Sequence, residues 1–275
     1  MFKTLNPVED TITTRITVTN GFHDGGVGTL AGSNYTTASL SATQKSYYYN
    51  LQYNSKDHFS VSYGHIGGSG SAEQSTTVEG TTQAIYKQFY NFTEPSAENI
   101  RDQKGFLGFG DGTATASDAY FVVAERLQMK DRLNPGTWTI NLSGSTTAGV
   151  GKFLKLTDDS KTTDPITPGS PFGEVYGIYS GSAGTVQSTG TRYGKFYPDA
   201  GLMVLSANEV SSSLPGSGSF VQAAGGSVIQ GNGLGQDTRV ADAVDNAWKM
   251  TRALQQGSVT LRSEEKQYIY DYFCR

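Results

Sequence analysis

The stretch from Tyr120 to Leu142 constrains the fold most, because it joins an apolar run, a turn and an alternating run. Its first part, Tyr120–Ala124, is short and made of aromatic, β-branched and small residues, which favours a buried strand over a helix. The Asn-Pro-Gly run at 134–136 predicts a type II turn, since proline presets φ and glycine supplies the positive φ that this turn requires. Strict alternation over 137–142 then predicts a half-buried strand. The apolar residues of that strand are Trp138, Ile140 and Leu142.

The rest of the chain repeats this pattern of short strands and turns. Its 34 glycines and 16 tyrosines are typical of many strands joined by tight turns. Further strands are expected at 58–65, 152–156, 258–261 and 268–273, and in the runs GEVYGIYSG, TRYGKFYPDAG and LMVLS. The sequence therefore predicts a mainly β protein with sandwich-like antiparallel sheets, of the β-rich α+β class.

Two segments change to a helical period. In 82–92 the apolar residues Ile85, Phe89 and Phe92 recur at helical spacing, and Pro95 ends the run. A second apolar face runs through 238–255, and Gly257 follows as a stop. That face consists of Val240, Ala243, Val244, Ala247, Thr251 and Leu254, with Trp248 at its edge. Two short helices are expected.

A length of 275 residues is compatible with one large β domain or with two smaller ones. Residues 1–45 carry little apolar surface and are expected to form an extended arm that packs on the body or on a partner. A plain first strand followed by a floppy loop is the alternative for this segment. The β-rich body is expected at 46–275. It can divide into two subdomains near 157–171, an exposed excursion that holds three of the eight prolines.

Composition excludes several classes of protein. A formal charge of −4 with 17% charged residues leaves no basic stripe for a nucleic-acid backbone. Cys274 is the only cysteine, so an internal disulfide and a thiolate metal cluster are impossible, and assembly in a cytosol is the simpler reading. No run approaches the ~18 apolar residues of a membrane span. The first residues also lack the apolar core of a signal peptide.

The candidate chemical groups point to no reaction. His58 and His65 are seven residues apart, which places them on opposite faces of a regular strand and argues against a metal pair. Both are interpreted as surface or rim residues. His23 precedes Asp24 in a glycine loop, but the chain contains no G-x-S-x-G nucleophile elbow.

The glycine and acidic clusters also favour structural roles. The runs at 105–112 and 231–235 lack the strand-to-helix context of a phosphate loop and are interpreted as turn glycines. Asp158, Asp159 and Asp164 do not follow calcium-loop spacing, which favours a solvated acidic loop. Paired carboxylates for glycoside cleavage remain open, because such pairs meet only in space. No catalytic residue, metal ligand or cofactor is assigned.

Several motifs together resemble a known family. They are EDTITTRI, SYYYNL, FSVSYGHIGGSGS, AIYKQFYNF, YFVVAERLQMKDRLNPGTWTINLSG, TRYGKFYPDAGLMVLS and YIYDYFCR. In this order they resemble a virion structural protein of T4-like contractile-tailed phages, especially those of cyanobacteria and other marine hosts. The match covers most of the chain, and RLNPGTW and FYPDAG are its most specific parts. The proteins that the chain resembles continue beyond the strand that ends at Arg275.

The resemblance implies a non-enzymatic subunit of the virion, made in the host cytoplasm and placed in the tail baseplate as a wedge component. Its expected partners are other tail and baseplate proteins, with several copies per particle and without nucleic acid or membrane contacts. The expected interface residues are Ile12, Ile16, Val18 and Phe22 in the arm and Tyr268, Tyr270 and Tyr272 in the last strand. A neck or connector protein, a fibre-type receptor-binding module and a glycan-cleaving enzyme are the alternatives.

Overall fold

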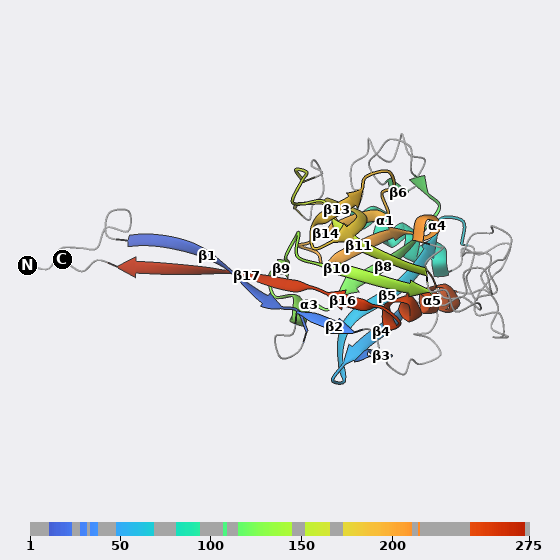
Figure 1. Cartoon of the computed structure of the whole chain (residues 1–275), viewed down its shortest axis with the longest axis horizontal. Helices are drawn as coiled ribbons and strands as arrows, with labels where there is room; N and C mark the ends of the chain where they lie inside the picture. Colours follow the sequence, from blue (N-terminus) through green and yellow to red (C-terminus); the bar gives the residue numbers. More distant parts are fainter. Residues whose placement is uncertain are drawn as a thin grey trace, which may run out of the picture.

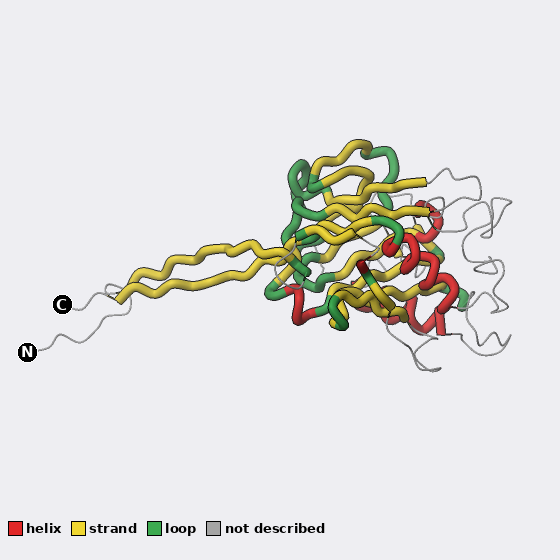
Figure 2. Tube along the Cα trace, turned by 60° about the horizontal axis from the view of Figure 1, so that its bottom comes forward, coloured by secondary structure: helices red, strands yellow, loops and turns green. Residues whose placement is uncertain are grey.

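The computed structural model describes residues 11–23, 28–31, 34–37, 48–68, 81–93, 107–108, 115–144, 152–165, 173–210, 214 and 243–272. These residues form a strand-rich body and a long two-stranded ribbon that projects from it (Figure 1). A second view shows the same projection (Figure 2). The molecule therefore has two regions with different surroundings.

The body is built on a twelve-stranded sheet that curls into a half-barrel. Its order is β2-β16-β10-β11-β12-β14-β15-β8-β5-β4-β3, and β13 pairs with β12. The strands are β2 (Thr29–Ala31), β3 (Thr36–Thr37), β4 (Tyr48–Tyr53), β5 (Lys56–His65), β8 (Asp118–Ala124), β10 (Thr139–Gly144), β11 (Lys152–Asp158), β12 (Tyr176–Ser182), β13 (Thr185–Ser188), β14 (Gly194–Tyr197), β15 (Leu202–Ser206) and β16 (Ser258–Thr260). Strands β6 (Leu107–Gly108) and β7 (Thr115–Ala116) form a separate pair. The predicted mainly β fold with antiparallel sheets is confirmed.

The described helices are α1 (Thr81–Thr93), α3 (Arg126–Met129), α4 (Ala207–Val210) and α5 (Ala243–Gln255). The two predicted helices correspond to α1 and α5, and residues 238–242 of the second lie outside the described residues. The single-turn helices α3 and α4 were not expected, because four residues are too few to show a helical period.

The core lies on both faces of the large sheet. Helix α5 packs through Ala247, Met250 and Leu254 against the face that carries Trp138 and Ile140. Helix α1 covers the other face with a second cluster. That cluster includes Ile85, Tyr86, Phe121, Leu202 and Val204. Strand alternation explains the division, since neighbouring residues of one strand point to opposite faces.

The glycine at 64 permits the close approach of α1. A Cβ atom there would lie 2.8 Å from the backbone nitrogen of Tyr86 and 3.0 Å from the Phe121 ring. Phe121 in turn stacks on Phe89 of α1, with ring centroids 4.0 Å apart. A larger residue in place of Gly64 would push the helix off the sheet.

The central stretch folds as predicted. Tyr120–Ala124 forms most of β8, and Gly136 has the positive φ of +73° that the turn at 134–136 requires. Trp138 lies directly before β10, Ile140 and Leu142 lie within it, and all three are buried. The pattern of apolar residues was a reliable guide where strands are half-buried.

The predicted exposed excursion at 157–171 is wrong at its beginning. Thr157, Asp158 and Asp159 are buried, whereas 161–164 are exposed. Strands β11 and β12 on either side are neighbours in one sheet, and residues 166–172 lie outside the described part. Two buried carboxylates are tolerated because each accepts backbone hydrogen bonds.

The two ends of the described chain build the ribbon together. β1 (Thr11–Gly21) pairs with β17 (Arg262–Tyr272), and β9 (Arg132–Leu133) joins β17 at the body. Strands β2 and β3, within the segment 1–45 that was expected as an arm, pair instead into the large sheet. The described ribbon therefore spans 11–21 and 262–272.

Candidate interface on the projecting ribbon

The ribbon is a regular antiparallel ladder. Its eleven pairs run from Thr11↔Tyr272 to Gly21↔Arg262 without a register shift. β1 is rich in threonine and isoleucine, and the distal part of β17 carries Tyr268, Ile269, Tyr270 and Tyr272. β-Branched and aromatic residues favour extended backbone. The pairing with β1 covers one edge of residues 268–272.

Among the ribbon side chains that the structure describes, four large apolar ones are exposed. The exposed fraction is 39% for Ile16, 54% for Tyr268, 45% for Ile269 and 54% for Tyr270. The register places Ile16 opposite Gln267 and Ile269 opposite Thr14, so Ile16 and Ile269 share one face. Tyr268 and Tyr270 occupy the other face. The ribbon thus exposes an aliphatic face and a tyrosine face.

Such a ribbon has no core of its own. A two-stranded ladder is marginally stable in water, because neither face is covered. In the described residues β17 gains a third strand only at its body end, where Ser263 and Glu264 pair with Leu133 and Arg132. The distal part is therefore a surface whose apolar groups remain available to a partner.

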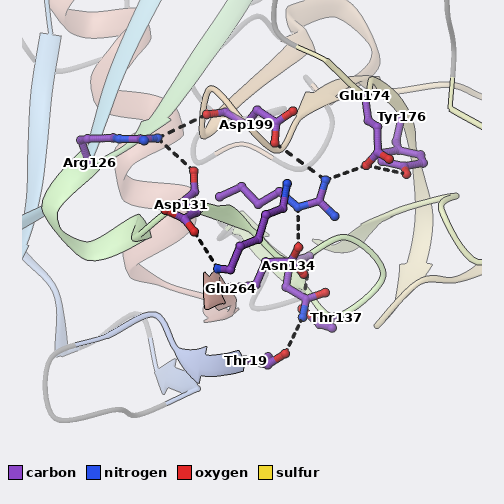
Figure 3. Close-up of polar contacts among 11 residues, drawn as sticks. Thr19, Arg126, Asp131, Asn134, Thr137, Glu174, Tyr176, Asp199 and Glu264 are labelled. Carbon is purple, nitrogen blue, oxygen red and sulfur yellow. Dashed lines mark hydrogen bonds and ion pairs between the residues drawn. The ribbon is translucent and has the colours of Figure 1, made fainter. Parts of the chain in front are cut away.

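The ribbon root, which we define as the polar cluster where β17 leaves the body, is centred on Arg132. Figure 3 labels its partners Glu174, Asp199 and Glu264. Arg132 Nε donates to Glu264 Oε1 of β17, and Nη1 donates to Glu174 Oε2 at 2.7 Å. Asp199 Oδ1 lies 3.7 Å from Nη1. The side chains of Arg132 and Glu264 are 18% and 7% exposed, so this ion pair is less screened than a surface pair.

The segment 131–134 also fixes both ribbon strands through hydrogen bonds. Asp131 Oδ2 accepts from the backbone nitrogen of Lys266 at 2.7 Å, and the Asn134 backbone nitrogen donates to the Arg262 carbonyl at 2.8 Å. The Asn134 side chain donates to Thr19 Oγ1 of β1 at 3.1 Å (Figure 3). The segment 131–134, which the sequence indicated only as a connection between strands, therefore also holds the ribbon in place.

The structure distributes the predicted interface residues unevenly. Ile16, Tyr268 and Tyr270 are exposed on the ribbon, and Val18 is half-buried there. The backbone of Ile12 and of Tyr272 belongs to β1 and β17, opposite Asp271 and Thr11 respectively. Whether these residues contact another subunit stays a prediction.

Phe22 differs from the other predicted interface residues. It is 1% exposed and stacks on Phe59 with ring centroids 5.1 Å apart. Phe22 follows the last residue of β1, where the chain enters the body, so its side chain belongs to the core of this chain. Ile269 was missed, although its position between two tyrosines in YIYDYF places it on the face opposite theirs.

The surface or rim interpretation was wrong for His58. His23 and His58 are buried with ring centroids 5.5 Å apart, and the Tyr35 hydroxyl lies 3.3 Å from His23 Nδ1. Burial, together with the neighbouring His58, lowers the pKa of His23 to about 4, so its ring is neutral at pH 7. The adjacent Phe22 draws this segment into the core. Half-buried His65, which accepts from the Gly67 backbone nitrogen at 3.0 Å, fits the predicted rim position.

The predicted solvated acidic loop was wrong for Asp158 and Asp159. Asp158 accepts the Gly136 backbone nitrogen through both carboxylate oxygens at 2.9 and 2.8 Å, and Asp159 Oδ1 accepts the Gly177 nitrogen at 2.9 Å. Burial raises the pKa of Asp158 to about 6. These contacts fix the turn at 134–136, which is a structural role. Asp164 is exposed as expected.

A third polar group is buried in the sheet. Asp118, Tyr63 and Tyr120 lie on β5 and β8, and within the described residues Asp118 Oδ2 and both tyrosine hydroxyls have no hydrogen-bond partner. Burial raises the pKa of Asp118 to about 7 and raises the pKa values of both tyrosines. His65 lies opposite Asp118 in the register. Asp118 and the two tyrosines can therefore hold protons in the core, but the three described side chains do not form an activated nucleophile.

No protein-family model matches this chain, and comparisons with curated proteins and with solved structures also find no match. Among the described residues, no group of three or more potential ligands could hold a metal ion. No helix in the described part of the chain is long and apolar enough to cross a bilayer. The ribbon is therefore the candidate functional surface among the described residues.

Proposed function

We propose that this chain is a non-enzymatic structural subunit of a contractile-tailed phage virion, a wedge component of the tail baseplate that contacts neighbouring subunits through its ribbon. The observation that carries the proposal is the projecting ribbon with exposed apolar residues on both faces. The placement in a virion and in its baseplate rests on the motif resemblance. The proposed mode of contact rests on the ribbon.

The residues on the ribbon suit a protein interface. Tyrosine is enriched at interfaces because it combines a large apolar ring with a polar hydroxyl, and few rotatable bonds are frozen when it binds. Tyr268 and Tyr270 on one face, with Ile16 and Ile269 on the other, would bury apolar area against two sides of a partner. We infer that the ribbon inserts between neighbouring subunits and does not lie flat on one.

The ribbon root would lower the cost of that insertion. Arg132 and Asp131 hold β17, and Asn134 holds both strands, before any partner is present. A pre-oriented element loses less conformational freedom on binding than a flexible arm does. A neck or connector position would use the same ribbon and differs only by its place in the particle.

The experiment uses purified phage particles and an antibody raised against the body of this chain. Mass spectrometry of the particles should detect the chain, and gold-labelled antibody should bind at the tail end that carries the baseplate. Label at the neck would move the subunit to the connector. Absence of the chain from particles, or label on projecting fibres, would overturn the proposal.

A further inference from the structure

The two outer edges of the ribbon differ in how many of their backbone N–H and C=O groups already form hydrogen bonds. On β17 the carbonyls of Arg262 and Glu264 accept from the backbone nitrogens of Asn134 and Asp131, and the Lys266 nitrogen donates to Asp131. Even-numbered residues of β17 therefore turn their backbone groups away from β1, and odd-numbered residues turn theirs toward it. From 262 to 266, the outer edge of β17 is therefore already hydrogen-bonded to the segment 131–134.

The outer edge of β1 is open over a longer distance. Because the odd residues of β17 pair with the even residues of β1, the outward backbone groups of β1 belong to its odd residues. Those residues are Thr11, Thr13, Arg15, Thr17 and Thr19. In the described part of the chain no backbone hydrogen bond reaches them from outside the β1–β17 ladder. The longer open edge is on β1.

Apart from the single charge of Arg15, the β1 edge also lacks the usual protection of exposed strands. Natural edge strands are short, bulged, or interrupted by proline or lysine, which prevents unwanted pairing. β1 is eleven residues long, contains neither proline nor lysine, and pairs without a register shift. By contrast, the β4–β5 and β12–β13 pairs in the body both shift register. An unprotected edge of this length suits a strand that receives another strand.

We propose that the outer edge of β1 receives an extended β-strand of a neighbouring particle protein, which turns the distal, two-stranded part of the ribbon into a three-stranded sheet. This inference rests on the proposed function and specifies how the contact is made. Arg15 is the only charged residue of β1, so the partner strand should carry an aspartate or glutamate in register with it. Threonine and other β-branched residues fit opposite the threonines whose backbone groups face outward, since such pairs stabilise neighbouring strands.

A second copy of this chain fits the edge less well. Antiparallel pairing of two β1 strands over the full open edge is centred on residue 15, which sets Arg15 against its own copy. Like charges directly opposite each other destabilise a strand pair. A shifted register avoids that contact but leaves part of the edge unpaired. Charge therefore favours a different protein as the occupant.

Amide hydrogen exchange at single-residue resolution tests the edge pairing. Purified chain and intact particles are exchanged in parallel, quenched and fragmented. The outward amides of Thr13, Arg15 and Thr17 should exchange about 100-fold or more slowly in the particle than in the isolated chain, because hydrogen bonding to a strand protects them. The inward amides of Thr14 and Ile16 report the ladder in both samples. Protection on the β17 edge at Tyr268 and Tyr270, without protection on β1, would overturn the choice of edge.

Proline variants provide a second measurement. Thr13→Pro and Thr17→Pro each remove one outward N–H and leave the inward ladder intact, as edge positions tolerate proline. Incorporation into particles should fall at least about tenfold, while Thr13→Val and Thr17→Val, which keep the N–H, should incorporate normally. Normal incorporation of the proline variants would contradict the proposal.

The outcomes separate the two proposals. If the chain is present in particles but its β1 amides exchange as fast as in the isolated chain, edge pairing is overturned and the structural role stands. The chain absent from particles overturns the proposed function and its partner strand together. A dimer of the isolated chain that Thr17→Pro dissociates would identify a second copy as the occupant and overturn the heterologous strand.

Discussion

The body and the ribbon use the same strand-forming residues in opposite ways. In the body Trp138 and Phe196 are buried with ring centroids 5.4 Å apart, and α5 closes the face above the strands. On the ribbon Tyr268 and Tyr270 are more than half exposed, and the contacts that hold them are backbone ladders and the polar root. Burial stabilises the first region, and pairing maintains the second.

The difference suggests separate tasks for the two regions. Removing apolar area from a core costs stability directly, whereas exposed apolar residues contribute little until a partner covers them. The body should therefore tolerate little change in the isolated chain. The distal ribbon should tolerate change in isolation and not in the assembled particle.

Truncation in the body should have the largest effect. Trp138→Ala removes a fully buried ring from the main core, and the free energy of unfolding should fall by about 3–5 kcal/mol. Urea denaturation of the isolated chain measures the change. A loss below about 1 kcal/mol would mean that the body does not depend on this core.

Breaking the ribbon root should have an intermediate effect. Arg132→Ala leaves the Glu264 carboxylate, which is largely buried, without its main partner. The expected loss is about 2 kcal/mol, between the values for exposed and for fully buried pairs. Amide exchange in 262–266 should accelerate more than exchange in the body. The matched control is Glu174→Gln, whose side chain is 41% exposed and whose loss should cost about 0.5 kcal/mol.

The pH dependence of the body should change with Asp118→Asn. Burial raises the pKa of Asp118 from 3.8 to about 7, so the folded chain keeps a proton that the unfolded chain releases. The stability of the native chain should therefore fall as pH rises from about 4 to about 7. Asp118→Asn should flatten this decline and make the variant more stable than the native chain at pH 7. Denaturation curves at about pH 3, where the group is largely protonated in both states, provide the reference. Parallel pH profiles for the two chains would contradict the assignment.

Truncation on the distal ribbon should have the smallest effect on the isolated chain. Tyr268→Ala combined with Tyr270→Ala should change the free energy of unfolding by less than about 0.5 kcal/mol, because both rings are mostly in water. The same double variant should incorporate poorly into particles, since buried tyrosines are common interface hot spots. Normal incorporation would remove the tyrosine face from the interface.

The sequence indicated the elements of the body better than their arrangement. Strict alternation over 137–142 and the helical spacing of Ile85 and Phe89 are local signals, and both correspond to observed elements. The burial of His23 and Asp158 was missed, because it depends on residues distant in the chain, such as His58 and Gly136. A polar residue type alone indicates a position on the surface. These residues are buried instead because they contact partners that are distant in the chain.

The ribbon shows the same limit at longer range. TITTRITV and YIYDYF each indicate a strand, but pairing between residues about 250 positions apart has no local signature. The root was equally hidden, because Arg132, Glu174 and Glu264 come from three separate segments. The turn at 134–136 could be recognised from its residues, but its contact with Thr19 could not.

A cryo-EM map of the intact particle, with this chain traced into density, tests the central claim most directly. We expect density for the body at the tail baseplate, with residues 11–21 and 262–272 inserted between other subunits and both apolar faces of the ribbon covered. A ribbon that projects into solvent within the assembled particle would contradict the account, even if the body occupied the baseplate.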